Sequence, residues 1–168
     1  MGETVGDFLV KRLAAWGVRR IYGYAGDGIN GILSAMNREQ GAIEFVQAAH
    51  EEVSAFMACA HAKYTGEVGV CMATSGPGAI HLLNGLYDAK LDGQPVVAIV
   101  GQQARSSLGG SFQQEVDLVS LFKDVAGVYV HESGGYRARY LSSEHLVLSP
   151  GQLDWARGRC CRPAGELS

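Results

Sequence analysis

The sequence predicts an α/β protein with three layers, in which a mostly parallel sheet has helices on both faces. Strand-like and helix-like segments alternate over residues 1–130 at the spacing of βαβ units, which favours parallel strands joined by right-handed crossovers. Two strand-like segments, 68–73 and 95–100, are apolar almost throughout, as expected when both faces of a strand are covered. Loops with glycine or acidic residues follow the strands, at the edge where an open sheet of this kind binds ligands.

The first elements follow from capping and periodicity. Thr4 and Asp7 have the spacing of a weak capping box in front of an apolar helical pattern, so a helix is expected to begin there. A β-rich run over 20–24 predicts a strand, apolar residues over 29–37 predict a second helix, and 43–48 predicts a second strand.

A third helix is expected after His50-Glu51-Glu52, with Gly66 at its end. Its predicted apolar face consists of Val53, Phe56, Met57, Ala60 and Tyr64. The strand over 68–73 leads into another helix, whose predicted apolar face consists of Ile80, Leu83, Leu86 and Tyr87. Three further elements complete the pattern: a strand over 95–100, a short helix over 116–122 and a strand over 125–130.

Length and composition limit the class of protein. A chain of 168 residues corresponds to about one domain, and 47% hydrophobic with 18% charged residues is typical of a globular protein. The net charge of -3 gives no electrostatic reason to expect nucleic acid or an acidic membrane as partner. The N-terminus lacks a basic segment followed by an apolar one, so we expect a cytoplasmic protein without a secretory signal.

The four cysteines do not have the spacing of a metal site. Cys59 falls in a helical pattern and Cys71 in a strand, both among apolar neighbours, so we expect buried and inert thiols. Cys160 and Cys161 are adjacent and lie in a stretch of different character. Residues 131–168 contain arginines but no lysine and show no sustained periodicity.

We interpret residues 131–168 as an atypical tail, either disordered or non-native sequence joined to a domain that spans 1–130. The residues 146–148 are the one segment of this tail that resembles a short strand.

Two loops after predicted strands are candidate ligand sites. Glu51 follows the strand over 43–48, and Ser75-Gly76-Pro77-Gly78 follows the strand over 68–73 and opens a helix. The second loop lacks the Gly-Lys-Ser/Thr ending of a nucleotide-binding P-loop. The glycine spacing over 26–31 fits a dinucleotide-binding turn, with Glu51 near the distance of the acid that binds the ribose, so NAD binding is an alternative.

Several ordered motifs carry a resemblance to a known family. They are His50–Phe56 (HEEVSAF), Gly69–Cys71, Ser75–Ala79 (SGPGA), Leu82–Asp88 (LLNGLYD), Pro95–Gln102 (PVVAIVGQ) and Gln114–Asp117 (QEVD). Together they resemble the pyrimidine-binding domain of thiamine diphosphate enzymes over residues 3–130. The pattern is most similar to pyruvate oxidase, pyruvate dehydrogenase (quinone) and acetolactate synthase, and it makes NAD binding a distant second choice.

The resemblance implies a role for Glu51 as the acid that hydrogen-bonds to N1′ of the aminopyrimidine ring. This bond favours the imino tautomer of the cofactor, which then removes the proton from the thiazolium C2 and starts the attack on a 2-keto acid. The implied cofactor-binding residues are Tyr24, Gly26, Asp27, Glu51, Ser75, Gly76, Pro77, Gly78 and Asn84, and the implied substrate residue is Gln114. We interpret His50 and His81, which are close to these motifs, as structural histidines.

One part of the family pattern is missing. Gly26-Asp27-Gly28 copies the beginning of the diphosphate motif, but the Asn-Asn that follows it after about 25 residues in the family occurs nowhere in this chain. The resemblance therefore implies that Mg²⁺ binds only through a diphosphate-binding domain outside this sequence. FAD is an option for a full-length oxidoreductase or transferase of this type.

Three interpretations remain open. The chain is a truncated fragment of a pyruvate oxidase-like enzyme, a natural small subunit of a two-subunit 2-keto acid decarboxylase, or a non-catalytic dimerisation domain. The expected partners are thiamine diphosphate and either a second copy of the chain, as in a homodimer, or a chain with the diphosphate-binding domain. Nucleic acid and membranes are not expected partners.

Overall fold

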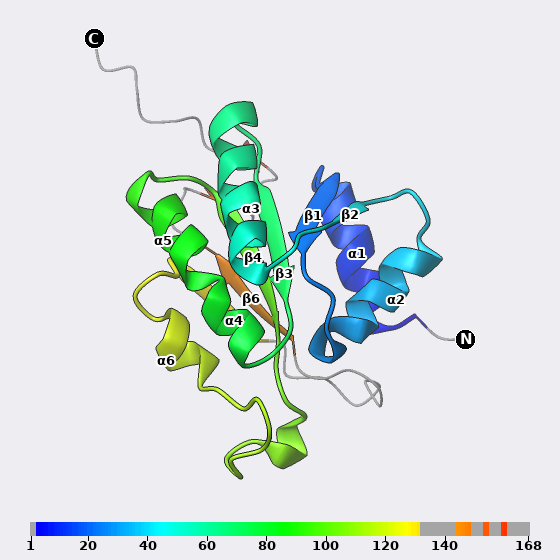
Figure 1. Ribbon diagram of the computed structural model, residues 1–168. Helices are drawn as coiled ribbons and strands as arrows, with labels where there is room; N and C mark the ends of the chain where they lie inside the picture. Colours follow the sequence, from blue (N-terminus) through cyan, green and yellow to red (C-terminus); the bar gives the residue numbers. More distant parts are fainter. Residues whose placement is uncertain (1–2, 132–143, 149–152, 155–158, 161–168) are drawn as a thin grey trace.

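The computed structural model describes residues 3–131, 144–148, 153–154 and 159–160. Its helices are α1 (Val5–Ala15), α2 (Asn30–Arg38), α3 (Glu51–Thr65), α4 (Pro77–His81), α5 (Leu83–Leu91) and α6 (Leu118–Phe122), with 3₁₀ turns at Asp27–Ile29 and Arg105–Ser107. Its strands are β1 (Arg20–Gly23), β2 (Glu44–Gln47), β3 (Gly69–Ala73), β4 (Val96–Gly101), β5 (Val128–His131), β6 (Glu144–Leu148), β7 (Leu153–Asp154) and β8 (Arg159–Cys160). The predicted α/β class with helices on both faces of the sheet is confirmed (Figure 1).

The main sheet has six strands in the order β2-β1-β3-β4-β6-β5. The first four are parallel, and β6 lies between β4 and β5 and is antiparallel to both. β6 contains the residues 146–148, where the sequence predicts a short strand. The division of the chain at residue 130 stays a prediction. Within the described residues, no helix has the length and apolar character needed to cross a membrane.

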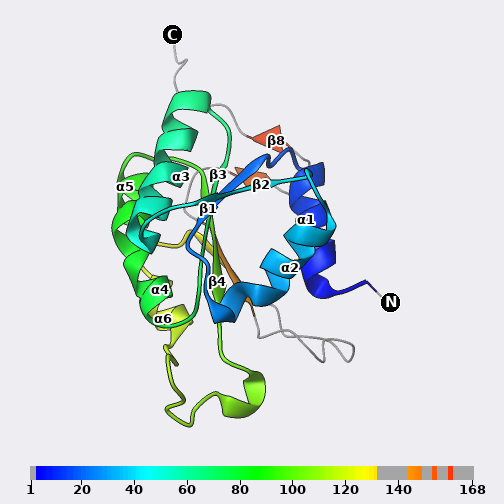
Figure 2. The ribbon, with the colours of Figure 1, turned by 45° about the vertical axis from the view of Figure 1, so that its right-hand side comes forward.

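Two hydrophobic cores fill the space between the sheet and its helices, and alternate residues of β3 and β4 point into them. Val70 and Met72 face the core under α1 and α2, whereas Cys71 and Ala73 face the core under α3 to α6. Figures 1 and 2 show the two helical layers on opposite sides of the sheet. Because both faces are covered, β3 and β4 are buried at every residue, as their apolar sequences predict.

The predicted apolar face of the third helix is wrong. Val53 and Phe56 are 44% and 42% exposed and Tyr64 is 91% exposed, whereas the buried positions are taken by smaller residues. These buried residues of α3, besides Glu51, are Ser54, Ala55, Ala58, Cys59 and Ala62. The reason is the close approach of α5: a Cβ added at Gly85 would lie 2.5 Å from the Cβ of Ala55, so only small side chains fit between the two helices.

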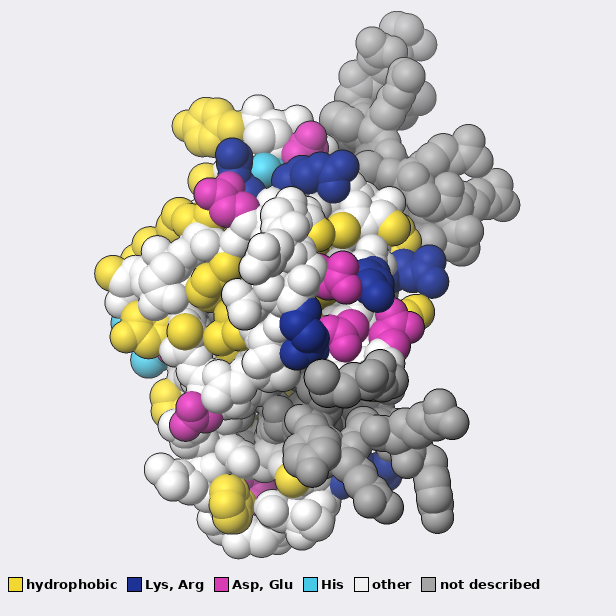
Figure 3. Space-filling model, turned by 90° about the vertical axis from the view of Figure 1, so that its right-hand side faces the viewer, with side chains coloured by type: hydrophobic (Ala, Val, Ile, Leu, Met, Phe, Trp, Pro, Cys, Tyr) yellow, Lys and Arg dark blue, Asp and Glu magenta, His cyan; other side chains and the backbone are white. Residues whose placement is uncertain are grey.

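The helix expected after residue 78 is also different from the prediction. It is divided at Leu82 into α4 and α5, and two members of its predicted face, Ile80 and Tyr87, are 44% and 37% exposed. Leu86 of the same face is buried, as predicted. Large apolar side chains therefore remain on the outer surface of α3 to α5. Figure 3 shows hydrophobic side chains gathered along that flank, at the left margin, while the α1–α2 side carries acidic and basic groups next to each other.

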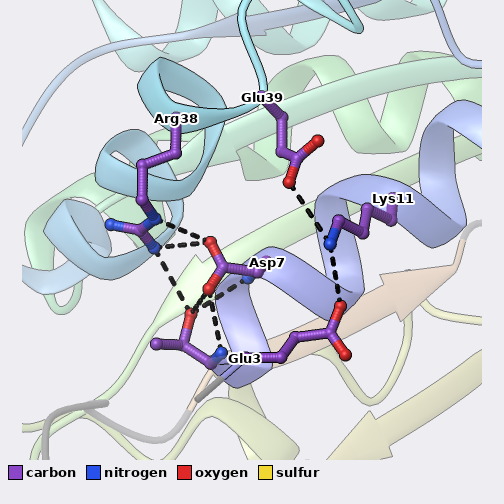
Figure 4. Close-up of polar contacts among 6 residues, drawn as sticks. Glu3, Asp7, Lys11, Arg38 and Glu39 are labelled. Atoms are coloured by element: carbon purple, nitrogen blue, oxygen red, sulfur yellow. Dashed lines mark hydrogen bonds and ion pairs between the residues drawn. The ribbon is translucent and has the colours of Figure 1, made fainter. Parts of the chain in front are cut away.

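The predicted capping box of α1 is confirmed and is part of a larger polar network (Figure 4). The Asp7 backbone N–H donates to Thr4 Oγ1 at 3.1 Å, and the Thr4 backbone N–H donates to Asp7 Oδ2 at 2.8 Å. Arg38 of α2 donates through Nε and Nη2 to Asp7 Oδ1 at 2.8 and 2.6 Å. Nearby, Lys11 bridges Glu3 and Glu39. The network joins the beginning of α1 to the end of α2.

Loss of the Asp7 carboxylate is expected to destabilise the fold. Hydrogen bonds from Thr4, together with the Arg38 guanidinium, lower the pKa of Asp7 from 3.8 to about 2. Because the pKa is lower in the folded state, its contribution is complete above about pH 4 and is lost as the pH falls toward 2. We expect Asp7→Asn to lower the free energy of unfolding by about 1–2 kcal/mol at pH 7.

Urea titrations of the wild type and Asp7→Asn at pH 7 and at pH 3 check this expectation. The difference in unfolding free energy between the two proteins should shrink at the lower pH. An equal difference at both pH values would contradict the assigned role of the carboxylate. Asp92→Asn, which changes a carboxylate at the far end of α5, is the matched control.

The two cysteines that were expected to be buried are buried and free. Burial and a bond from Cys59 Sγ to Asp88 Oδ2 at 3.1 Å raise the pKa of Cys59 to about 11. Burial raises the pKa of Cys71 to about 12. Both thiols are therefore protonated at neutral pH, which agrees with an inert role. The side chain of Cys160 and all of Cys161 lie outside what is described.

Candidate functional site

The loops after β1, β2 and β3 lie at the carboxyl edge of the parallel strands. β2 lies on one side of β1, and β3 and β4 lie on the other side. The strand order therefore reverses at β1, and open α/β sheets bind ligands at such a point. α3 begins with Glu51 after β2, and α4 begins with Pro77 after β3. The two loops singled out from the sequence therefore do meet at one edge.

Close backbone contacts connect these loops. The Gly28 N–H donates to Thr74 Oγ1 at 3.0 Å, which joins the loop after β1 to the loop after β3. A Cβ added at Gly101 would lie 2.7 Å from the carbonyl oxygen of Gly28 and 3.1 Å from the backbone nitrogen of Ser75. The end of β4 is thus packed directly against both loops, and the floor of the site is backbone.

Glu51 is the buried acidic group of the site. Its side chain is only 11% exposed, and its Oε2 lies 3.1 Å from His81 Nδ1 and 3.9 Å from His50 Nε2. Its other oxygen, Oε1, faces the loop after β3: a Cβ added at Gly78 would lie 3.4 Å from it. The carboxylate is therefore placed between two imidazoles on one side and a glycine backbone on the other.

His50 and His81 stack against each other, with ring centroids 4.3 Å apart and planes inclined by 34°. His50 is also the N-cap of α3, because its Nδ1 accepts the backbone N–H of Glu52 at 3.2 Å. His81 comes from the last residue of α4. Sequence reasoning assigned both histidines a structural role and missed that they converge on Glu51. The available signal was their position next to Glu51 and to the Ser75–Gly78 loop in the sequence.

Ser75, Gly76 and Gln114 are brought together. Ser75 is buried, and its Oγ accepts the Gln103 side-chain N–H at 3.2 Å and lies 3.5 Å from Gln114 Oε1. Gly76 has φ of 61°, and a Cβ there would lie 2.7 Å from the carbonyl oxygen of Gln114. This position therefore requires glycine, both for its backbone angle and for the contact with the segment that carries Gln114.

The other predicted site residues are at the edge of this arrangement. Tyr24 is 39% exposed, and its backbone N–H bonds to the carbonyl of Met72 at 3.4 Å. Asp27 is exposed and accepts a hydrogen bond from Asn30 at 3.3 Å, and it follows Gly26, whose backbone packs against Thr74. Asn84 donates to Glu52 rather than to Glu51. Pro77 is the exposed first residue of α4.

Comparison with known proteins identifies the family. Residues 3–121 match the family model described as thiamine pyrophosphate enzyme, N-terminal TPP binding domain. YdaP of Bacillus subtilis, named as a thiamine pyrophosphate-containing protein, is 48% identical over 124 residues, which are 74% of this chain and 22% of that protein. Pyruvate oxidase of Lactiplantibacillus plantarum is 44% identical over 121 residues, or 72% of this chain and 20% of that enzyme.

An acetolactate synthase of Arthrospira platensis is 43% identical over 151 residues, which are 86% of this chain and 26% of that enzyme. That share is larger than residues 1–130 alone can supply, so the alignment includes part of the stretch after residue 130. This chain spans about a fifth to a quarter of the length of these three relatives. It belongs to the thiamine pyrophosphate enzymes and carries their N-terminal TPP binding domain.

Proposed function

We propose that this domain holds the aminopyrimidine ring of thiamine diphosphate and that Glu51 is the carboxyl group that bonds to the ring. The observation that carries the proposal is the buried Glu51 carboxyl at the carboxyl edge of the sheet, next to the glycine loop that opens α4. The proposed enzyme converts a 2-keto acid such as pyruvate, in line with the name of the pyruvate oxidase relative.

The residues present fit such a ring. A Cβ at Gly78 would lie 3.4 Å from Glu51 Oε1 and only 2.8 Å from Thr74 Cγ2, so glycine is required beside the carboxyl and presents backbone to a ring that bonds there. Since Oε2 already bonds to His81, Oε1 is the oxygen available to an incoming ring nitrogen. Ser75 and the Gly76 backbone, held by Gln114 and its neighbours, form the adjoining wall.

Thiamine diphosphate, when bound, supplies the nucleophilic carbon that attacks the keto group of the substrate. The contribution of this chain is to bind the aminopyrimidine ring and to polarise it. Glu51 bonds to the ring nitrogen through Oε1, and His81 fixes the carboxyl through Oε2. Tyr24, Gly26 and Asp27 line the outer part of the site, and Gln114 is proposed to face the substrate.

The Mg²⁺ and diphosphate half of the cofactor does not fit the described residues. Asp27, whose Gly-Asp-Gly context only copies the beginning of the diphosphate motif, is bonded to Asn30 at the start of α2, and the sequence has no Asn-Asn to complete that motif. We therefore propose that Mg²⁺, the diphosphate and any FAD are held by sequence outside this chain. That sequence is either the rest of a longer enzyme or a separate subunit; a dimerisation domain without catalysis is the remaining alternative.

Titration calorimetry with thiamine diphosphate and Mg²⁺ tests the proposal. We expect binding only when a chain with the Gly-Asp-Gly…Asn-Asn motif is present, because that chain supplies the diphosphate ligands. Absence of binding in both conditions would overturn the proposal and leave the dimerisation domain. A gene for such a chain directly downstream would identify a two-subunit enzyme.

The outer surface of α3 to α5 has the character of an interface with a partner chain. Val53, Phe56, Ile80 and Tyr87 expose large apolar side chains on neighbouring helices, close to the buried Glu51. Such a surface is costly in water and is typical of a protein interface. We expect the chain to self-associate at micromolar concentration, with Phe56→Ser shifting it toward monomer.

Sedimentation velocity measures this association. Phe8→Ser is the control: it removes an exposed aromatic side chain from α1, on the opposite face of the sheet, and should leave the association unchanged. A wild-type chain that sediments as a monomer at micromolar concentration would argue against the interface. A cytoplasmic location, and assignment of the enzyme as an oxidoreductase or a transferase, stay predictions that cell fractionation and product analysis would test.

A further inference from the structure

His50, Glu51 and His81 have the geometry of a metal site. One ligand atom from each residue lies within 4.8 Å of the other two, with Glu51 Oε2 at 3.1 Å from His81 Nδ1 and 3.9 Å from His50 Nε2. Zinc bonds to nitrogen and oxygen at about 2.0–2.2 Å, so two ligands on a tetrahedral ion lie about 3.4 Å apart. The two observed separations lie on either side of this value. Because the stacked rings are inclined by only 34° and imidazole binds metal in its ring plane, one imidazole has to rotate before both nitrogens face one ion.

The charge of the cluster also favours a cation. The Glu51 side chain is about nine-tenths buried, and among the described residues its side-chain polar partners are the two histidines rather than a lysine or arginine. A buried carboxylate without a strong cationic partner is stabilised by a divalent ion. The histidine side chains are 45% and 42% exposed, which leaves an open path for the ion from solvent.

We propose that His50, Glu51 and His81 form a binding site for Zn²⁺. Two imidazole nitrogens and one carboxylate are the ligand set of open zinc sites, in which water fills the remaining position. Imidazole ligands favour zinc and similar transition metals over Mg²⁺ and Ca²⁺, which prefer oxygen. This ion is therefore distinct from the magnesium of the diphosphate.

The three ligands are not equivalent. His50 Nδ1 accepts the Glu52 N–H, so the neutral ring carries its proton on Nε2, the nitrogen that faces Glu51. Binding of zinc there moves this proton to Nδ1 and breaks the cap of α3. For His81, Nδ1 already lies next to Glu51 Oε2. Zinc binding there moves the ring proton from Nδ1 to Nε2, and no helix cap depends on it. His81 and Glu51 are thus the stronger ligands.

Zinc titration of the 168-residue chain, followed by calorimetry, tests the site. Cys160 and Cys161 are first replaced by serine, because adjacent thiols can bind zinc by themselves. We expect one ion per chain with a dissociation constant of about 10 μM or tighter. His81→Ala and Glu51→Gln should each weaken binding about 100-fold, and His50→Ala about tenfold.

His61→Gln is the matched control. His61 lies in the second half of α3, where it bonds to Tyr22 and Glu67, so its substitution should leave zinc affinity unchanged. Cobalt provides a second readout: Co²⁺ should give the visible absorption of a tetrahedral site with nitrogen and oxygen ligands, and lose it in His81→Ala. Circular dichroism confirms that each variant is folded. Unchanged zinc affinity in folded His81→Ala and Glu51→Gln would overturn the site.

The consequence for the cofactor rests on the proposed function. Zinc and the aminopyrimidine ring both need the Glu51 carboxyl, so thiamine diphosphate with Mg²⁺ and the diphosphate-binding chain should raise the apparent zinc dissociation constant. Zinc binding without this competition would support the metal site and overturn the role of Glu51 toward the ring. Glu51-dependent cofactor binding without any zinc binding would overturn the metal site alone.

Discussion

Glu51→Gln is expected to slow exchange of the thiazolium C2 proton by a factor of about 10²–10⁴ in the complex with a diphosphate-binding chain. Glutamine keeps the size of the side chain and can still accept the hydrogen bond from His81. It cannot share a proton with the ring nitrogen as a carboxyl does. Deuterium exchange at C2, quenched by acid and read by proton NMR, measures the rate.

Glu52→Gln is the matched control for this substitution. Glu52 is the next residue in α3, but its carboxylate accepts a hydrogen bond from Asn84 of α5. We expect its exchange rate to stay within about threefold of the wild type. Wild-type exchange in Glu51→Gln, with cofactor bound, would refute the role of Glu51.

Gly85→Val is expected to lower the free energy of unfolding by about 3 kcal/mol. A Cβ at this position would lie 2.5 Å from the Ala55 Cβ and 2.6 Å from the Phe56 backbone nitrogen, so α5 must move away from α3. The added side chain cannot be relieved by a rotamer change because the nearest atoms are backbone and Cβ. Urea denaturation followed by circular dichroism measures the loss.

Gly110→Val tests whether the loss of stability in Gly85→Val comes from the contact between α3 and α5. The nearest heavy atom to a Cβ at Gly110 is 3.5 Å away, and the residue is exposed in a loop. We expect its stability to change by less than about 0.5 kcal/mol. A similar loss in both variants would mean that the contact between the helices is not the cause.

Local signals predicted much of the fold. The Thr4–Asp7 capping box and the end of α3 at Gly66, which has φ of 72°, depend on a few neighbouring residues, and both are confirmed. The apolar runs of β3 and β4 likewise predicted burial on both faces. Each of these features is determined within one turn or one strand, so a single sequence contains the necessary information.

Features that depend on contact between distant segments were not predictable. Helical periodicity placed Val53, Phe56 and Tyr64 toward the core, but the space there is limited by Gly85 of another helix. The convergence of His50 and His81 on Glu51 depends on how two loops approach each other across β1. The motifs indicated Glu51 and the glycine loop, but not which side chains would surround the carboxyl.

The close contact of α3 with α5 has a consequence for motion at the site. α3 is in contact with β1, β3 and α5 along its length, so an opening that displaces Glu51 has to separate several elements together. Amide hydrogens from Ala55 to Ala62 should therefore exchange with solvent only through global unfolding, at the slowest rate in the molecule. The segment that carries Gln114, which lies in loop structure and is largely exposed, should exchange by local fluctuation. We therefore expect the half of the site that carries Glu51 to be rigid and the half that carries Gln114 to change its conformation locally.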